Sequence, residues 1–407
     1  MRTLILLKGL VKSEKLKWVK DEGLNNYLLD IEVIERLYSY PELSGFKKEV
    51  LRKSQSTLVY KQFIEILFLR MSRGNLIVLD MDSGDTNGVV TLAKIFGYNI
   101  FYKVFKIPQD YISNHSKYIF NYCQNRKKSD LELEVKQFLN FQIIGNEIHK
   151  YSDVIKYWKS KELVIKLGKN DRTLLVSDIH SNYSLFKKLN HSSYDLCVCL
   201  GDYIDGYEKD GSRKLIDFIA SNKILYSNVL FLEGNHEIRL RKYLGWLYLR
   251  TINSKSIITS TLYSSIPDEF LESTALEFSD LSATKAWELL DILNERLFTH
   301  AILKRDGKTY VCSHSGFKYM AQISPEYIGS LIYGSRNIEE QDRLFSKNYK
   351  NKPIYSIHGH CYYMSKWNPV MFPKVVNLDP EQTGREIVFT ELTKNNKFKI
   401  NTLCQEK

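Results

Sequence analysis

Three short apolar segments in the middle of the chain, residues 173–176, 196–200 and 229–232, are each bounded by polar residues. Runs of four or five apolar residues with such boundaries are typical of fully buried strands in a parallel sheet. The carboxyl ends of parallel strands lie at one edge of the sheet, where ligands bind. We therefore expect the side chains that follow these three segments to meet at that edge.

The polar residues that follow the three segments are carboxylates, an amide and imidazoles. In chain order they are Asp178, His180, Asp202, Asp205, Asn235 and His236. Carboxylate oxygens and imidazole nitrogens are the donors that divalent transition ions prefer in proteins. The pattern therefore predicts a metal site at the edge of this sheet.

Two further apolar segments end in histidine-containing clauses, at residues 311–316 and 355–360. The first clause contains His314, and the second contains His358 and His360. Residues two apart on a strand point to the same face. A ligand role for His358 therefore stays open beside a purely structural one.

The amino-terminal part of the chain also alternates apolar and helical segments. Residues 2–7, 74–80 and 99–105 are expected to be strands, and residues 15–22 and 131–141 are expected to lie in helices. Strands that alternate with helices indicate an α/β domain with a parallel sheet. The sequence therefore predicts a second α/β domain at this end of the chain.

The segment between the first strand and the first helix has the spacing of a phosphate-binding P-loop. That loop needs a glycine, four residues, and then Gly-Lys-Ser/Thr. Gly9 and Lys15 keep this spacing, but Glu14 replaces the second glycine and Leu16 replaces the hydroxyl residue. A carboxylate repels phosphate, and leucine cannot bind magnesium. We interpret Gly9 and Lys15 as remnants of a nucleotide site that is catalytically degenerate.

The length of 407 residues is sufficient for two domains, which we expect at residues 1–160 and 165–407 with a short junction between them. The net charge is +11, and residues 1–168 contain 27 Lys and Arg against 19 Asp and Glu. The first domain therefore carries most of the excess. A basic domain suits a polyanion such as nucleic acid, and the alternative is a lysine-rich surface without such a partner.

The six cysteines show no CxxC spacing, and Cys197, Cys199 and Cys312 lie inside predicted buried strands. Buried, unpaired cysteine indicates a reducing compartment, and we expect a cytoplasmic protein. No apolar segment reaches membrane length, and the one at residues 4–7 is too short for a signal peptide. No membrane partner is expected.

The strand-end clauses together resemble those of the calcineurin-like metallophosphoesterases. They read D-x-H, G-D-x-x-D, G-N-H-E, H-S-G and G-H, in this order, over residues 178–360. The resemblance implies a four-layer α/β/β/α domain that hydrolyses phosphoesters with two divalent ions. Because imidazole ligands favour transition ions over Mg²⁺, Mn²⁺ is the expected metal, and Fe, Zn or Ni would also suit these ligands.

The resemblance also implies a ligand set for each ion, in which Asp202 bridges the two. The other ligands of the first ion would be Asp178 and His180. The other ligands of the second ion would be Asn235, His314 and His360.

His236 would protonate the leaving group, and Asp205 would orient its imidazole. Phosphoprotein phosphatases of this family hold the substrate phosphate with arginines at two positions where this chain has Gly206 and Glu233. A third arginine of the family lies between the last two clauses, and Arg336 corresponds to it. We therefore assign Arg336 a catalytic role as the phosphate clamp.

The order of elements in the first domain, with Asp30 before a helix, resembles the kinase domain of polynucleotide kinase-phosphatases. The resemblance implies that Asp30 would be a general base for a 5′-hydroxyl and that Arg126 would lie in a lid over the triphosphate. Because its P-loop is broken, we interpret the domain as a pseudokinase. It would hold nucleic acid or brace the second domain.

The two resemblances together imply an enzyme that heals nucleic-acid ends, most readily those of RNA. It would remove a 3′-phosphate or a 2′,3′-cyclic phosphate, and its partner would be the broken end. The Gly-Asn-His-Glu clause favours a different substrate, that of a serine/threonine phosphoprotein phosphatase. A nucleotide or dinucleoside polyphosphate hydrolase and a non-catalytic binding module stay open as well, and no oligomeric state is predicted.

Overall fold

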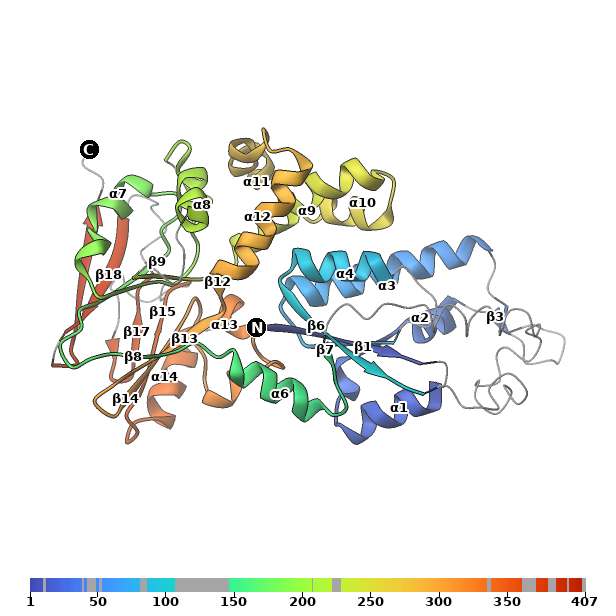
Figure 1. Ribbon diagram of the computed structural model, residues 1–407, viewed down its shortest axis with the longest axis horizontal. Helices are drawn as coiled ribbons and strands as arrows, with labels where there is room; N and C mark the ends of the chain where they lie inside the picture. The colour runs from blue at the N-terminus through green and yellow to red at the C-terminus, as the bar shows by residue number, and fades with distance from the viewer. Residues whose placement is uncertain are drawn as a thin grey trace. The chain divides into compact units, whose positions relative to one another are not determined.

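A computed structural model describes residues 1–9, 12–38, 40–41, 49–50, 53–80, 86–106, 146–206, 208–221, 228–334, 338–360, 371–379, 386–393 and 395–404. The chain divides into two compact units, shown in Figure 1. The first unit comprises Arg2–Ala93 and Gly97–Lys159. The second comprises Ser160–Lys407 together with Met1 and Lys94–Phe96.

The first unit is built on a five-stranded sheet in the order β2-β5-β1-β6-β7. Its strands are Arg2–Lys8 (β1), Leu28–Asp30 (β2), Ile77–Asp80 (β5), Tyr98–Val104 (β6) and Asn146–Glu147 (β7). All four pairings are parallel. Strand β1 lies in the centre, and its four consecutive apolar side chains from Leu4 onward are almost inaccessible to solvent. The predicted parallel sheet in this part of the chain is confirmed.

The helices of the first unit connect these strands. They are Lys12–Asp21 (α1), Ile31–Tyr38 (α2), Lys53–Ser72 (α3), Thr86–Ile95 (α4) and Tyr151–Ser160 (α6), with a 3-10 turn at Asn25–Tyr27 and a short strand pair of Tyr40–Pro41 (β3) and Glu49–Val50 (β4). The start of α1 was predicted at Lys15, but residues 12–14 are already helical. The segment contains neither glycine nor proline, and Glu14 in the first turn suits the positive end of the helix dipole. The predicted helix at 131–141 lies outside the described residues.

The second unit contains two six-stranded sheets. The first has the order β12-β11-β10-β9-β18-β19. Its strands are Thr173–Ser177 (β9), Leu196–Cys199 (β10), Val229–Leu232 (β11), Leu297–Phe298 (β12), Glu386–Leu392 (β18) and Phe398–Cys404 (β19). β9 to β12 run parallel, and β18 is antiparallel to β9. The three strands predicted from the apolar segments are therefore neighbours.

The second sheet has the order β16-β17-β15-β14-β13-β8. Its strands are Val164–Lys166 (β8), His300–Arg305 (β13), Lys308–Ser313 (β14), Ile354–His358 (β15), Met371–Phe372 (β16) and Val375–Asn377 (β17). The two sheets share one core, in which Leu175 and Val198 of the first sheet cluster with Leu303 and Ile357 of the second. The sheets therefore face each other across apolar side chains.

Helices alternate with the strands of the two sheets, which gives the predicted mixed α/β architecture. They are Tyr183–Lys188 (α7), Gly211–Ser221 (α8), Glu237–Asn253 (α9), Ile257–Ser264 (α10), Asp268–Glu272 (α11), Ala283–Arg296 (α12), Ser330–Tyr333 (α13) and Ile338–Asn348 (α14), with 3-10 turns at His191–Ser193, Thr274–Phe278 (η4) and Met320–Gln322. Phe218 of α8 packs edge-on against Phe231 of β11, with ring centroids 5.9 Å apart. On the other side, α14 contacts β16 and β17.

Within the described ranges no helix is both long and apolar enough to cross a bilayer. Among the described cysteines, Cys197, Cys199 and Cys312 are buried and free, and Cys404 is exposed and free. The three buried thiols behave as small apolar side chains in the strands, as the sequence predicted.

A buried ion pair anchors α9 to the end of β11. Arg241 donates from Nε to the carboxylate of Glu233, and the two side chains are 1% and 2% exposed. Arg241 also donates to the side-chain oxygen of Asn294 and to the backbone oxygen of Leu293 on α12. Because α9 begins where the third polar clause ends, this pair fixes the helix relative to the strand.

We expect Arg241→Ala to destabilise the second unit strongly. Loss of one partner of a buried ion pair typically costs about 3–5 kcal/mol, since the remaining charge loses its counter-charge in a poorly solvated place. The midpoint of thermal or denaturant unfolding measures the effect. Arg250→Ala, at the exposed end of the same helix, is the matched control and should unfold like the wild type. Similar midpoints for both variants would contradict the assigned role of the pair.

Candidate metal centre

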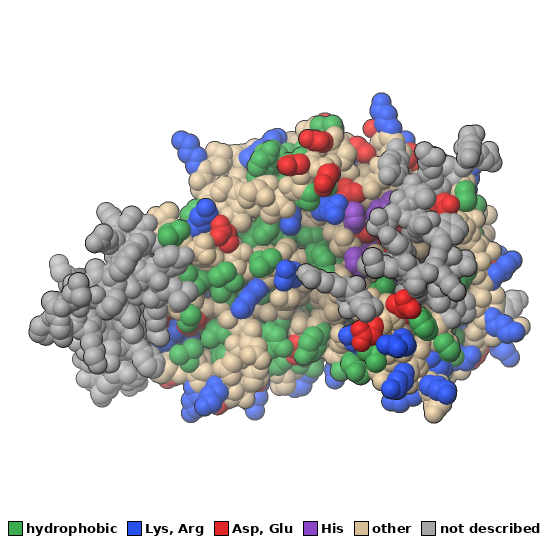
Figure 2. Space-filling view, turned by 180° about the vertical axis from the view of Figure 1, so that it is seen from behind, with side chains coloured by type: hydrophobic (Ala, Val, Ile, Leu, Met, Phe, Trp, Pro, Cys, Tyr) green, Lys and Arg blue, Asp and Glu red, His purple; other side chains and the backbone are tan. Residues whose placement is uncertain are grey.

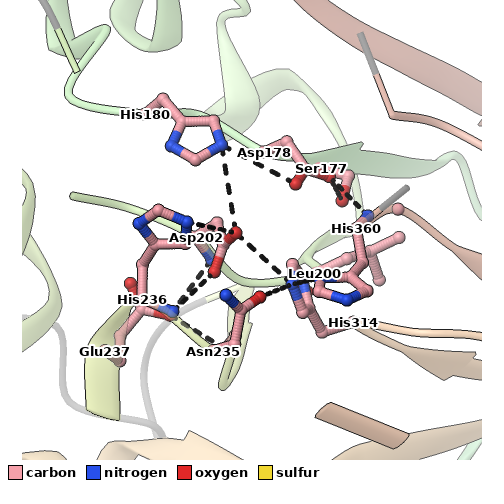
Figure 3. Close-up of polar contacts among 12 residues, drawn as sticks. Ser177, Asp178, His180, Leu200, Asp202, Asn235, His236, Glu237, His314 and His360 are labelled. Carbon is pink, nitrogen blue, oxygen red and sulfur yellow. Dashed lines mark hydrogen bonds and ion pairs between the residues drawn. The ribbon is translucent and has the colours of Figure 1, made fainter. Parts of the chain in front are cut away.

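The predicted polar clauses lie at the carboxyl ends of β9, β10 and β11. The parallel register aligns Val176 with Cys199 and Cys199 with Phe231, so these strands end at the same edge. The clauses of the second sheet follow β14 and β15, which are also parallel. Figure 3 shows how side chains from both sheets point toward one another. The cluster includes all six residues predicted as ligands: Asp178, His180, Asp202, Asn235, His314 and His360.

Five residues of the polar clauses adopt left-handed backbone conformations. Their φ angles lie between 42° and 76°, and they are Asp178, His180, Asp202, Asp205 and His360. Such a conformation costs of order 1–3 kcal/mol for an L-residue and persists only where surrounding contacts enforce it. Here His180 donates from its backbone to Asp202, and Gly359 donates to His314, each at 2.9 Å. Backbone hydrogen bonds between neighbouring clauses therefore hold these residues in the left-handed conformation.

Gly234 and Glu237 fix the second and third clauses against each other. A Cβ atom on Gly234 would lie 2.1 Å from Asp202 Oδ1, so only glycine fits there. The Glu237 carboxylate accepts hydrogen bonds from the backbone N–H groups of Asp202 at 3.0 Å, Tyr203 at 2.8 Å and Gly234 at 2.8 Å. Burial, together with the nearby charge of Asp202, raises the pKa of Glu237 to about 7. This side chain is an internal brace and does not reach solvent.

In one group of candidate ligand atoms, none of the facing atoms can donate a hydrogen bond when the imidazole rings are neutral. His314 Nε2 lies 3.0 Å from Asn235 Oδ1 and 3.0 Å from His360 Nδ1. The opposite ring nitrogens donate to backbone carbonyls, His314 Nδ1 to Leu200 at 2.9 Å and His360 Nε2 to Tyr333 at 3.0 Å. In the neutral rings the facing atoms are therefore three lone pairs. Such an arrangement repels itself unless a cation lies between the three atoms, so the residues fit a metal ion.

A second group lies on the other side of Asp202. The Oδ2 atom of Asp202 is 3.4 Å from His314 Nε2, 3.9 Å from His180 Nε2 and 3.6 Å from His236 Nε2. Asp178 Oδ1 is also 3.9 Å from His180 Nε2. The ligand atoms of His180, Asp202 and His236 lie close enough together to hold an ion, and so do those of Asp202, His314 and His360. The Asp202 carboxylate belongs to both groups, as a bridging ligand would.

The charges in the centre show that it attracts positive charge. Burial works to lower the pKa of His314, but the Asp202 carboxylate raises it to about 10. Burial and the positive charge of His314 lower the pKa of His360 to about 4. Without a metal, a proton on His314 would therefore partly neutralise Asp202. A divalent ion would displace this proton and would find His360 already neutral.

His236 and Asp205 form a hydrogen-bonded pair beside the metal ligands. His236 Nδ1 lies 2.7 Å from Asp205 Oδ2, which leaves Nε2 facing the centre. Arg239 donates to the same carboxylate oxygen at 2.8 Å, and Thr274 donates to Oδ1 at 2.6 Å. Burial works to raise the pKa of Asp205, but these partners together lower it. Burial likewise opposes protonation of His236, yet Asp202 and Asp205 raise its pKa, which favours a protonated ring.

Sequence reasoning missed three polar residues around the centre. Thr274 lies 69 positions from Asp205 and has no motif, so no local pattern points to it. Arg239 lies three positions after His236 on the helix that starts there, which is a signal that could have been used. Asp379 lies two positions after the end of β17, and burial together with the charge of Asp178 raises its pKa.

His358 and Glu233 both have structural roles and do not face the candidate metal ligands. His358 is fully buried, with Nε2 3.0 Å from both oxygens of Asp342 and Nδ1 against the Gly359 carbonyl, so neither nitrogen is left for a metal. Glu233 turns into the ion pair with Arg241 and away from the centre. Arg336, the predicted clamp, lies outside the described residues.

In the first unit, the lysine of the P-loop-like segment is paired internally. Lys15 is fully buried, and its Nζ lies 2.7 Å from Asp80 Oδ1. Lys12 Nζ lies 2.7 Å from the other oxygen of Asp80 and 2.8 Å from Asp30, the predicted general base. Burial works to lower the pKa of Lys12, but Asp80 and Asp30 raise it above its ordinary value. These two ammonium groups already have counter-charges within the protein.

The glycine of that segment also has a structural partner. A Cβ atom on Gly9 would lie 2.7 Å from the Cβ of Phe105, which follows β6. Phe105 in turn donates from its backbone to Lys8 at 2.8 Å. The close approach of β1 to the end of β6 is therefore sufficient reason for glycine at this position. Arg126 lies outside the described residues.

We expect Asp202→Asn to weaken metal binding by at least about tenfold, because the variant removes the charge shared by both groups. Loss of a residue that only supports a ligand already costs about 10–100-fold in metal affinity. Metal analysis after dialysis against Mn²⁺ gives the bound metal per chain. The control is Asp217→Asn on α8, whose side chain is 61% exposed. An unchanged metal content in Asp202→Asn would contradict the assignment.

Comparison with protein families supports the same chemistry. The family model described as calcineurin-like phosphoesterase matches residues 171–367, a range that contains the whole cluster. Comparison with curated proteins found no match to the chain. Five strand ends bring carboxylates, an amide and imidazoles together. They lie in the segment that matches this family, and the two observations agree on the chemistry of the second unit. Residues 171–367 form a calcineurin-like metallophosphoesterase domain, and the protein is a metal-dependent phosphoester hydrolase.

Proposed function

We propose that the second unit holds two divalent ions and hydrolyses phosphoesters at nucleic-acid ends. The observation that carries the metal-dependent part is the convergence of His314 Nε2, His360 Nδ1 and Asn235 Oδ1, which present three lone pairs to one another when both rings are neutral. Asp178, His180 and Asp202 would hold one ion, and Asp202 would share the second ion with those three atoms. Mn²⁺ is the metal that this ligand set favours.

The ions would supply Lewis acidity toward the phosphate and toward the attacking water. The residues of the chain provide the rest. His236 faces the centre with Nε2 and is held through Nδ1 by Asp205. A protonated imidazole at this position can donate to the oxygen of the leaving alcohol. Its exposed fraction of 19% gives a substrate access to the ring, and Figure 2 shows histidine side chains at the surface.

The proposed substrate is a 3′-phosphate or a 2′,3′-cyclic phosphate at a nucleic-acid end. Its support is the basic character of residues 1–168, with 27 Lys and Arg against 19 Asp and Glu. Polyanions bind to such an excess of charge. Lys12 and Lys15 are neutralised internally, so the remaining lysines and arginines of this region would make the contacts.

The first unit is proposed to be a pseudokinase. Helix α1 already includes residues 12–14, which in a P-loop belong to the loop whose backbone amides surround a phosphate. The ammonium group of Lys15 is directed to Asp80 rather than to a ligand. A nucleotide would have to separate this buried ion pair before it could gain the lysine. We therefore expect no ATP-dependent phosphorylation of a 5′-hydroxyl end.

The Gly-Asn-His-Glu clause does not discriminate in favour of a phosphoprotein substrate. Its glutamate, Glu237, is fully buried and binds three backbone N–H groups. It cannot touch a substrate, so a preference for a phosphoprotein would have to come from other residues.

One experiment compares substrates on a single Mn²⁺-loaded preparation. Oligonucleotides that end in a 3′-phosphate or a 2′,3′-cyclic phosphate, a phosphoserine peptide and a dinucleoside polyphosphate are assayed at equal concentration. We expect kcat/KM for an oligonucleotide end to exceed that for the peptide by more than tenfold. The same preparation with labelled ATP and a 5′-hydroxyl oligonucleotide should transfer no label. A preference for the peptide would overturn the substrate, and transferred label would overturn the pseudokinase.

A second test concerns the proton donor. His236→Ala should slow hydrolysis of an alkyl phosphate by about 10²–10⁴-fold, the usual contribution of general acid catalysis. Hydrolysis of p-nitrophenyl phosphate should fall much less, because nitrophenolate leaves without a proton. The ratio of the two rate losses is the measurement, and metal content serves as the control. Equal losses on both substrates would show that His236 is a metal ligand or a structural residue instead.

A further inference from the structure

Arg239 lies beside the hydrogen-bonded pair of His236 and Asp205. It is in the first turn of α9, and its Nη1 donates to Asp205 Oδ2 at 2.8 Å. The same oxygen is 2.7 Å from His236 Nδ1. The guanidinium is therefore within two hydrogen-bond lengths of the proposed proton donor. Among the described arginines of α9, only Arg239 donates to Asp205.

The guanidinium has donors to spare. Arginine has five N–H groups in a planar fork, and only Nη1 of Arg239 is used within the described residues. The side chain is 33% exposed, so the remaining N–H groups are accessible to a ligand. The Asp205 carboxylate is shared between Arg239 and His236 Nδ1, and it uses only one donor of the guanidinium. Burial and the positive charge of Arg239 lower the pKa of Lys242, one turn further along α9, to about 8.

The structure closes two other positions for a phosphate-binding side chain. A Cβ atom on Gly206, which follows Asp205, would lie 1.6 Å from the backbone oxygen of His180, so no arginine fits there. Glu233, which precedes Gly234, is buried in its ion pair with Arg241. Neither position 206 nor position 233 therefore offers a cation to a phosphate, and the first turn of α9 supplies one from a different element.

We propose that Arg239 binds a non-bridging oxygen of the substrate phosphate while Asp205 holds it in position. Asp205 then has two functions, because it orients the His236 ring and fixes the guanidinium beside it. A planar guanidinium can contact a carboxylate and a phosphate oxygen at once, which an ammonium group cannot do with the same geometry. This inference rests on the proposed hydrolysis of phosphoesters at the metal centre, but it does not depend on which alcohol carries the phosphate.

The test uses inorganic phosphate, which is the product of any phosphomonoesterase. Calorimetric titration of phosphate into the Mn²⁺-loaded full chain gives its Kd, and inhibition of p-nitrophenyl phosphate hydrolysis gives its Ki. We expect Arg239→Ala to weaken both by about 10–100-fold, the usual effect of losing a hydrogen bond to a charged group. Arg239→Lys should recover only part of the affinity, and the content of bound metal should stay at the wild-type value.

Two matched variants separate phosphate binding from a positioning effect. Thr274→Val removes the other hydrogen bond to Asp205, so it should lower kcat through the His236 ring and leave the Kd of phosphate within about twofold. Arg250→Ala removes an exposed arginine from the far end of the same helix and should change neither quantity.

The inference is overturned if Arg239→Ala and Arg239→Lys bind phosphate like the wild type, even when kcat falls. It is equally overturned if the metal-loaded wild type does not bind phosphate at all. A preference for phosphopeptide over oligonucleotide ends would overturn the proposed substrate alone, since the change in phosphate affinity would remain. The far-ultraviolet circular dichroism of each variant shows whether it is folded.

Discussion

The carboxylate of Glu237 is the interaction on which the geometry of the metal centre depends. It receives the backbone N–H groups of Asp202, Tyr203 and Gly234, which belong to the ends of two neighbouring strands. Without that shared acceptor, three buried N–H groups would lack partners, and each would cost about 1–3 kcal/mol. Asp202 is thereby held so close to Gly234 that no residue with a Cβ atom would fit at position 234. Asp202, which belongs to both groups of candidate ligand atoms, is thus positioned by backbone contacts.

The same centre combines strain with electrostatic tension. Left-handed residues such as Asp178 and His180 are held by hydrogen bonds between clauses, and in the neutral rings the lone pairs of His314 and His360 face each other at 3.0 Å. Both features are unfavourable in isolation, and a bound cation relieves the second of them. Metal binding and the stability of this edge of the sheet are therefore linked. The strand cores behind the edge are apolar and do not depend on the ion in this way.

The sequence predicts much of this arrangement because parallel strands leave a simple pattern. Each apolar segment such as 229–232 forms the strand expected, and the clauses after the strands lie together because parallel strands end at one edge. The contacts that complete the site are less predictable. Thr274 in the 3-10 turn η4 donates a hydrogen bond to Asp205, and Asp342 on α14 accepts one from His358. Such contacts depend on tertiary packing between distant segments, for which one sequence carries no periodic signal.

The start of α1 shows how substitutions change what a motif predicts. Gly9 and Lys15 have the spacing of a phosphate loop, and α1 already includes Lys12. A motif specifies a loop only when its second glycine is present to interrupt the helix. Once Glu14 occupies that position, nothing in the segment opposes helix formation.

The buried cluster of Lys12, Lys15, Asp30 and Asp80 gives the first unit its own counter-ions. Proteins that bind a polyphosphate at such a site gain stability from the ligand in proportion to the logarithm of its concentration. In this cluster two ammonium groups face two carboxylates, so neutralising the lysines does not require an outside anion. The buried lysines of this cluster therefore keep their counter-charges whatever the concentration of nucleotide around the protein.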